Sequence, residues 1–323
     1  MNGLPDRLQA ALARLTEGVS RRELAERARA ISVGYRSGGT SKPITDSRDA
    51  LAYALARMPA TYAAVSACLA ALGAARPDFA PASMIDAGAG PGTAAWAATE
   101  AFPALTDVLL LDANAALLSL AKELATGNER IAEAGFRSGS AAQLLANAPT
   151  ADLVVASYLI GELDERHRTE LAVAMWERTR DTLLIVEPGT PAGYARIIAV
   201  RAQLVAKGAY VLAPCPHEQA CPLVAPDWCH FAQRLPRSRD HMLMKDADVP
   251  FEDEKFSYVA LSRSPPETRA ARVLAAPHAG KAAIDATLCT PSGVVNASVP
   301  RRNKAAYATA RRWRWGDGVQ YSP

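Results

Sequence analysis

The stretch Asp86-Ala87-Gly88-Ala89-Gly90-Pro91-Gly92 decides the fold of this chain. It follows a short apolar segment, residues 83–86, and leads into an alanine-rich segment, residues 93–101, with the composition of a helix. Glycines are needed where the backbone turns sharply and where a ligand lies against it with no Cβ in the way. A helix that begins after such a turn directs free N–H groups toward a polar ligand. The stretch therefore predicts a ligand-binding strand–turn–helix unit.

Apolar segments with the length of buried strands recur along the chain and alternate with helical segments. This alternation predicts an α/β fold, a parallel sheet with helices on both faces. The strands are predicted over residues 83–86, 107–112, 136–139, 152–157 and 182–187.

The flanking regions differ in character from this α/β segment. Residues 1–78 have apolar side chains at helical spacing and predict an N-terminal helical cap. Residues 79–212 predict the Rossmann-like domain. Residues 213–323 contain an irregular Pro-, Cys- and His-rich stretch up to residue 250, further strands and a basic tail, and predict a C-terminal extension.

The spacing of the glycines indicates the cofactor. A dinucleotide fingerprint reads G-x-G-x-x-G, whereas this chain has G-x-G-x-G with Asp86 two residues before Gly88. The variant resembles the first motif of class I S-adenosylmethionine-dependent methyltransferases. Asp112 ends the second strand, where a carboxylate can accept hydrogen bonds from both ribose hydroxyls. The residues predicted to bind the cofactor are Asp86, Gly88, Gly90, Gly92, Asp112, Ser140 after the third strand and Ser157 at the end of the fourth.

No catalytic residue follows from the sequence. The fourth strand is followed by Ser157 and Tyr158, without the Asn/Asp-Pro-Pro-Tyr signature associated with amine methylation. It is also not followed by a Pro-Cys nucleophile, which disfavours a covalent cytosine-C5 mechanism. Tyr158 is interpreted either as a residue that stacks on a base or as a core tyrosine.

Four cysteines form a second constellation. Cys215, Cys221 and Cys229 have the spacing C-x₅-C-x₇-C, and Cys289 lies 60 residues further on. Four thiolates can bind a [4Fe–4S] cluster or complete the tetrahedral shell of Zn²⁺. Zinc usually takes closer cysteine pairs, so the spacing favours the cluster, with zinc as the alternative and His217 or His230 as further ligands. Cys68 lies on an apolar helix face and is predicted to be a core residue.

The C-terminal tail is basic and carries aromatic residues. Cations neutralise phosphates, and aromatic rings stack on unpaired bases, so RNA binding is one interpretation; a solvated charged helix whose tryptophans pack on the protein is the other. The cations predicted to contact RNA are Arg301, Arg302, Lys304, Arg311, Arg312 and Arg314.

Composition limits the class of protein. The chain has 323 residues, half of them hydrophobic, and a net charge of +3, which permits a nucleic-acid partner without requiring one. The sequence contains no run of 18 apolar residues and therefore predicts no membrane span. Its N-terminus resembles neither a signal peptide nor a transit peptide. We therefore expect a cytoplasmic protein without a membrane partner; its oligomeric state does not follow from the sequence.

Several of these features together resemble one family. They are the glycine turn, Glu187-Pro188-Gly189-Thr190-Pro191, the cysteine spacing, and Arg312-Trp313-Arg314-Trp315-Gly316-Asp317. The chain is similar to the methyltransferase-like assembly factors of the mitochondrial small ribosomal subunit, a family with bacterial members. The resemblance implies a class I methyltransferase fold, a [4Fe–4S] cluster on the four cysteines, and binding to small-subunit ribosomal RNA or its assembly intermediate.

Two functions follow as hypotheses. The first is an S-adenosylmethionine-dependent methyltransferase-like protein that acts on or binds small-subunit ribosomal RNA in ribosome assembly or translation. The second is a non-catalytic iron–sulfur RNA-binding assembly factor. A radical S-adenosylmethionine enzyme is disfavoured, because the C-x₃-C-x₂-C spacing that leaves one iron open is missing.

Overall fold

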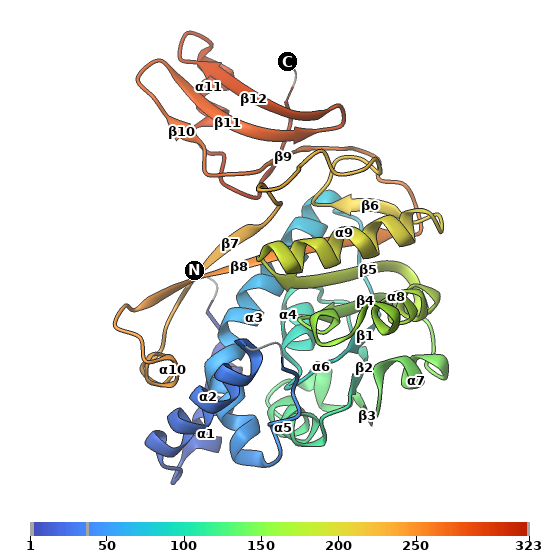
Figure 1. Ribbon diagram of the computed structural model, residues 1–323, viewed down its shortest axis with the longest axis vertical. Coiled ribbons are helices and arrows are strands. Elements are labelled where there is room, and N and C mark those ends of the chain that lie inside the picture. The colour runs from blue at the N-terminus through green and yellow to red at the C-terminus, as the bar shows by residue number, and fades with distance from the viewer. Residues whose placement is uncertain (1–2, 37–38, 322–323) are drawn as a thin grey trace.

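The computed structural model describes residues 3–36 and 39–321 and contains a larger and a smaller β-sheet (Figure 1). The strands of the larger sheet are β1 (Ser83–Ala87), β2 (Asp107–Asp112), β3 (Gly135–Ser138), β4 (Ala151–Ser157), β5 (Thr179–Pro188), β6 (Tyr210–Ala213), β7 (Phe231–Pro236) and β8 (Phe251–Ser262). Their order is β3-β2-β1-β4-β5-β8-β6, with β7 also paired to β8. The strands β1 to β5 are parallel, and β8 is antiparallel to β5, β6 and β7. This is the predicted Rossmann-like α/β sheet.

Helices cover both faces of the larger sheet. Alternate residues of each strand point to opposite faces, so Met84 of β1 packs in one core and its neighbour Ile85 in the other. The helices on the Met84 face are α1 (Asp6–Thr16), α2 (Arg21–Arg36), α3 (Ser47–Ala75), α4 (Thr93–Ala101), α5 (Ala115–Ala125) and α6 (Glu129–Ala132). Those on the Ile85 face are α7 (Ala141–Ala146), α8 (Glu165–Arg178) and α9 (Pro191–Val205), together with the short η1 (Ile160–Glu162).

The helix α3 is the longest of the described helices. It begins after Asp46, whose side chain accepts a hydrogen bond from the Asp49 N–H at 2.8 Å, and it runs for 29 residues. Its length and apolar composition match those of a membrane-spanning helix, and half of its most apolar stretch is buried in the protein. Because it packs against α2, α4, α5 and β8, we interpret its apolar character as that of a core helix.

The smaller sheet lies beyond β6 and β7, at the end of the molecule where the C-terminus emerges (Figure 1). Its strands β11 and β12 form an antiparallel hairpin, which turns through Pro291 and Ser292. Its elements are β9 (Ala271–Val273), β10 (His278–Ala279), β11 (Ala283–Thr290), β12 (Gly293–Pro300), the helix α11 (Lys304–Ala310) and β13 (Gly318–Val319).

The stretch from residue 213 to 250 is more ordered than predicted. It contains β7 and the helix α10 (Arg239–Lys245). The strand β7 forms because β8 extends far enough to pair with it over its full length. The helix α10 begins where the Ser238 side chain accepts a hydrogen bond from the His241 N–H at 3.1 Å.

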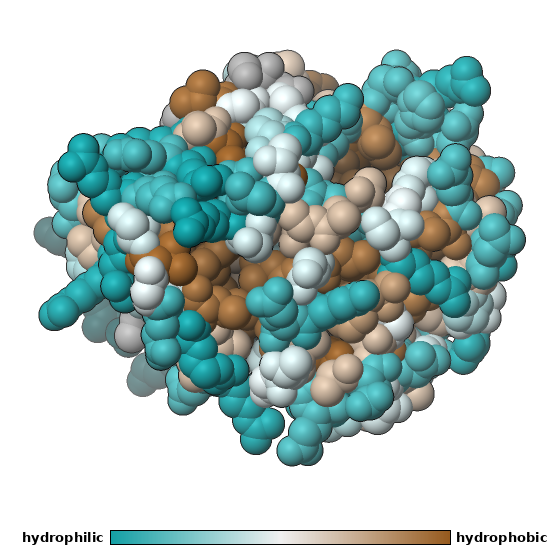
Figure 2. Space-filling model, turned by 90° about the horizontal axis from the view of Figure 1, so that it is seen from below, coloured by the Kyte–Doolittle hydropathy of each residue, from teal (hydrophilic) through white to brown (hydrophobic). Residues whose placement is uncertain are grey.

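The surface at the lower end of the molecule is not uniformly polar. Figure 2 shows hydrophobic residues in a band across the middle of this face, between hydrophilic residues. Exposed large apolar side chains in the described chain include Leu243, Val249 and Phe251, around α10 and the start of β8.

Candidate functional site

The glycine turn joins β1 to α4 at the carboxyl edge of the parallel strands. Gly88, Gly90 and Gly92 have φ angles of 71°, 54° and 82°, in the left-handed region that favours glycine. The N–H groups of Gly88 and Ala89 donate to the Leu111 carbonyl at 2.8 and 3.0 Å. A Cβ on Gly90 would meet no atom within 4 Å, so open space lies over this residue. The turn thus presents a backbone surface that a ligand can approach closely.

Asp112 lies beside this turn at the end of β2. Its carboxylate accepts hydrogen bonds from the Gly90 N–H and the Asn114 N–H, each at 2.7 Å. Burial raises the pKa of Asp112, and these two donors act against that effect. A carboxylate oxygen has more than one lone pair, so Asp112 can accept further hydrogen bonds from a ligand. The structure therefore brings together Asp112 and Gly90, two of the residues predicted to bind the cofactor.

Asp86 is fully buried under the turn. Neither of its carboxyl oxygens has a hydrogen-bond partner of normal geometry among the described residues. Burial first, and the nearby Asp112 second, raise the pKa of Asp86 to about 7, and a weak interaction with the Ala95 N–H offsets only part of this. A buried polar group without a partner is uncommon and often marks the place of a ligand or water.

This carboxyl predicts a pH dependence of stability. The pKa of Asp86 is about 7 in the folded chain and about 3.9 in an unfolded one. Between these values the folded state holds a proton that the unfolded state has released, so stability falls as the pH rises from about 4 to about 7. We expect Asp86→Asn to be more stable than the unmodified chain by roughly 2–4 kcal/mol at pH 8, and much less so at pH 4. Urea unfolding at several pH values measures this difference; a difference that does not change with pH would contradict the assignment.

A loop before α3 lies across the same edge of the sheet. The Asn114 Nδ2 donates to the carbonyls of Ser41 and Ile44 at 3.0 and 2.9 Å. The Ser41 N–H in turn donates to Glu162 Oε2 of η1 at 3.2 Å. These bonds hold the loop over the region between the ends of β2 and β4. The N-terminal segment thus contributes to the site as well as to the core.

The two predicted serines lie at different places. Ser140 is exposed, and its side chain caps α7 by accepting from the Gln143 N–H at 3.5 Å. Ser157 ends β4 half-buried, at the same edge as the glycine turn.

Tyr158 has a strained backbone directly after β4. Its φ of 57° is in the left-handed region, which is uncommon for a residue with a large side chain and is found preferentially at functional sites. Its hydroxyl donates to Glu254 Oε1 at 2.8 Å, and Arg57 Nη2 lies 3.9 Å from the same oxygen. The phenol is therefore engaged with the protein, which favours the interpretation as a core tyrosine over that of a base-stacking residue.

The four C-terminal cysteines gather where the two sheets meet. Cys215 follows β6, Cys229 precedes β7, and both line one small cavity with Cys221. Cys289 is contributed by β11, and its Sγ lies 3.7 Å from the His217 Nε2. All four are free thiols. Burial first, and then the neighbouring Cys215, raise the pKa of Cys289 to about 12, which reflects how close the thiols lie to one another.

The donor set has the chemistry of a metal site. No group of three or more His, Cys, Asp or Glu side chains in residues 3–36 and 39–321 has an arrangement that could hold a metal ion as it stands. Four thiols that converge from two sheets are nevertheless the ligands that zinc and iron–sulfur clusters take. Binding requires their side chains to turn toward a common centre.

The predicted RNA-binding cations lie along α11 and the segments on either side of it. All six side chains are exposed. By contrast, two arginines at the end of β7 are neutralised, since Arg234 pairs with Asp253 at 2.7 Å and Arg237 with Glu252 at 3.3 Å. The six cations of the C-terminal segment, unlike these two arginines, take part in no ion pair among the described residues.

The tryptophans of this segment face the protein. The Trp315 Nε1 donates to the His230 carbonyl at 2.9 Å, and its ring packs edge-on against the His230 ring. Trp313 packs on the core of the smaller sheet. Both rings serve to attach the C-terminal segment to the rest of the chain, as in the second interpretation of the tail.

Comparison of the sequence with known families gives a match over most of the chain. The profile described as "Mitochondrial small ribosomal subunit Rsm22" matches residues 47–320, which include the glycine turn, the four cysteines and the basic tail. The chain belongs to the Rsm22 family. The fold and the family resemblance predicted from the sequence are confirmed.

A curated human protein is similar to most of this Rsm22-family chain. The chain is 32% identical over 286 residues to the human "Ribosome assembly protein METTL17, mitochondrial", an alignment that spans 83% of this chain and 61% of the relative. The chain thus spans about three fifths of the length of that protein.

Solved structures of low sequence identity are also similar. One is a putative RNA methyltransferase from Pyrococcus horikoshii, with 13% identity, a TM-score of 0.41, and coverage of 61% of this chain and 83% of that one. Another is magnesium protoporphyrin IX methyltransferase from Synechocystis with bound S-adenosylmethionine, with 12% identity, a TM-score of 0.40, and coverage of 68% and 84%.

Several residues at the site of this Rsm22-family chain were not predicted from the sequence. Asn114, Ser41, Arg57 and Glu254 approach the glycine turn or Tyr158 through contacts between distant segments. Glu254 is 96 residues from Tyr158, for example. Such pairs carry no local sequence signal, because nothing in the spacing of either segment indicates the other.

Proposed function

We propose that this chain binds S-adenosylmethionine at the glycine turn and engages small-subunit ribosomal RNA, or its assembly intermediate, during ribosome assembly in the cytoplasm. The observation that carries the proposal is a left-handed glycine turn beside a buried acid in a chain of the Rsm22 family. The free cysteines suit a reducing compartment.

The residues at the turn fit such a cofactor. Gly88, Gly90 and Gly92 would line its polar end, and Asp112 would accept hydrogen bonds from its ribose. The Asp86 carboxyl, which has no hydrogen-bond partner of normal geometry among the described residues, and the open space over Gly90 are the features of the turn that a bound ligand would use. When bound, S-adenosylmethionine supplies an electrophilic methyl group, and the protein would contribute mainly by positioning the acceptor.

Paired glycine substitutions test the cofactor site. Gly90→Ala and Gly208→Ala both place a Cβ in open space on a backbone with positive φ, at 54° and 87°, so each costs about 1 kcal/mol of stability. Only Gly90 is at the turn. We expect Gly90→Ala to weaken S-adenosylmethionine binding at least about tenfold, while Gly208→Ala binds like the unmodified chain. Isothermal titration measures both; no detectable binding by the unmodified chain would refute the cofactor proposal.

The four cysteines are proposed to hold a [4Fe–4S] cluster, with zinc as the alternative. Their convergence from β6, the loop before β7, and β11 supports a metal that joins the two sheets. A metal would also stabilise residues 214–230, which contain no helix or strand.

A non-catalytic RNA-binding assembly factor is the second candidate. The observation that favours it is the engagement of the Tyr158 hydroxyl by Glu254, which leaves this residue after β4 unavailable to a substrate. Incubation of immature small subunits with isotopically labelled S-adenosylmethionine separates the two candidates. Label in the small-subunit RNA supports the methyltransferase, and its absence with cofactor-loaded protein supports the non-catalytic factor.

A further inference from the structure

Two buried arginines have no acidic partner. Arg201 of α9 is 2% exposed and Arg272 of β9 is 6% exposed. Neither takes part in an ion pair among the described residues, whereas the nearby Arg269 pairs with Glu218 at 2.6 Å. A guanidinium keeps its charge in proteins, and an uncompensated buried charge is strongly destabilising. These two arginines therefore require a source of negative charge that is not a carboxylate.

Both arginines donate to the backbone around the cysteines. The Arg201 Nη2 donates to the carbonyls of His217 and Gln219 at 2.6 and 2.8 Å, and its Nε has no partner. The Arg272 Nε donates to the Pro214 carbonyl at 3.0 Å, and its Nη1 to the Gly316 carbonyl at 2.7 Å. Carbonyl oxygens solvate a cation but do not neutralise it.

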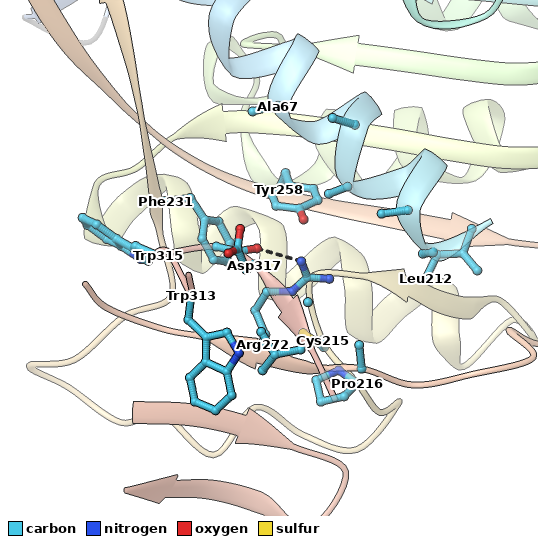
Figure 3. Close-up of a pocket in the computed structure, with 18 of the residues that line it drawn as sticks. Ala67, Leu212, Cys215, Pro216, Phe231, Tyr258, Arg272, Trp313, Trp315 and Asp317 are labelled. Atoms are coloured by element: carbon cyan, nitrogen blue, oxygen red, sulfur yellow. Dashed lines mark hydrogen bonds between the residues drawn. The ribbon is translucent and has the colours of Figure 1, made fainter. Parts of the chain in front are cut away.

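The two side chains approach the cysteines from different sides. Arg201 lines the small cavity that contains Cys215, Cys221 and Cys229. Arg272 is the direct neighbour of Cys289 in the ladder between β9 and β11. It also lines, with Cys215, a larger cavity of about 750 Å³ between α3 and the C-terminal segment (Figure 3).

We propose that Arg201 and Arg272 are the counter-charges of a metal centre with four thiolate ligands. The proposal rests on the metal site proposed above and specifies its charge. Four thiolates around Zn²⁺, or around an oxidised [4Fe–4S] core of the same charge, form a centre with two net negative charges, and two guanidinium groups neutralise it. A site with two cysteines and two neutral histidines around Zn²⁺ would have no net charge and would leave both arginines uncompensated. The arginine pair therefore favours four-cysteine ligation over a mixed Cys/His site.

Arg272 also connects the centre to the C-terminal segment. In Figure 3 it lies between Cys215 and Pro216 on one side and Asp317 on the other. Its two hydrogen bonds join Pro214, next to the first cysteine, to Gly316, next to Trp315. Arg201 and Arg272 are thus positioning residues, which hold the cysteine loop against α9 and against the tail.

Methionine and lysine substitutions separate charge from packing. We expect Arg201→Met and Arg272→Met to release their metal to a chelator at least about tenfold faster than the unmodified chain. Arg201→Lys and Arg272→Lys, which keep the positive charge, should release it at nearly the same rate as the unmodified chain. The methionine variants should also unfold at a lower temperature when metal-loaded, but at the same or a higher temperature after the metal is stripped. A role in packing alone would lower both temperatures.

The outcomes distinguish this inference from the metal site itself. Arg269→Met is the matched control, since Arg269 lines the same larger cavity but has its own carboxylate, and its metal release should be unchanged. If the unmodified chain, purified anaerobically, contains neither iron nor zinc, the metal site is refuted. If it contains metal but the methionine variants release it no faster than the lysine variants, only the counter-charge role is refuted. If the methionine variants fail to fold, the lysine variants provide the test. The counter-charge role is then refuted if they release metal as fast as a Cys289→Ser chain does.

Discussion

Cys289→Ser is expected to lose most of the bound metal and to unfold at a clearly lower temperature. Cys289 is the one proposed ligand contributed by the smaller sheet, so its loss both opens the coordination shell and disconnects that sheet from the loop of Cys215. Structural metal sites with cysteine ligands contribute on the order of 10 kcal/mol in small domains. Metal per chain and visible absorption after anaerobic purification, with a thermal unfolding curve, measure the effect.

Cys68→Ser is the control for this substitution. Cys68 is fully buried on α3. Its substitution replaces a thiol with a hydroxyl, as Cys289→Ser does, but in an apolar environment, and should lower the free energy of unfolding by roughly 1–3 kcal/mol. It should therefore lose stability but retain its full metal content. Equal metal in Cys289→Ser, Cys68→Ser and the unmodified chain would show that Cys289 is not a ligand.

Reversal of two charges in the tail is expected to weaken RNA binding by roughly 10- to 100-fold at moderate salt. Arg311 and Arg312 are exposed at the end of α11 and take part in no ion pair among the described residues. Each phosphate contact that is lost lowers the number of counterions that binding releases from the RNA. The affinity of the variant should therefore also depend less steeply on salt concentration. Fluorescence anisotropy with a small-subunit ribosomal RNA fragment at several salt concentrations measures both quantities for Arg311→Glu/Arg312→Glu.

A second double variant controls for net charge. Arg22→Glu/Arg166→Glu makes the same change in total charge on α2 and α8. The side chains of these two arginines are 90% and 82% exposed, and among the described residues each forms an ion pair only with a glutamate one helical turn away. Surface pairs of this kind contribute little to stability. This variant should bind RNA nearly as well as the unmodified chain; equal losses in both variants would assign the effect to overall charge and not to the tail.

The parallel sheet could be predicted from the sequence because its signals are local. Buried parallel strands are continuous apolar runs, and each is followed by a turn or a helix, so the predicted segment 152–157 corresponds to β4 (Ala151–Ser157) within one residue. The glycine turn was equally predictable, since positive φ angles at Gly88, Gly90 and Gly92 are the reason that glycine occurs there.

What could not be predicted depends on contacts between distant segments. β7 contains Gln233 and Arg234 and ends at Pro236, so it has weak strand character of its own and forms because β8 extends to meet it. The loop at Ser41 lies over the sheet edge only through Asn114 and Glu162. The missing acidic partners of Arg201 and Arg272 became apparent only when the packing around the cysteines was known.

Cross-linking in living cells tests the central claim most directly. The tagged chain and its Arg311→Glu/Arg312→Glu variant would be cross-linked to RNA with ultraviolet light, purified under denaturing conditions, and the attached RNA sequenced. The proposed function predicts strong enrichment of small-subunit over large-subunit ribosomal RNA for the unmodified chain, and much less cross-linked RNA for the variant. Equal recovery of both ribosomal RNAs, or no RNA above background, would contradict a role in assembly of the small subunit.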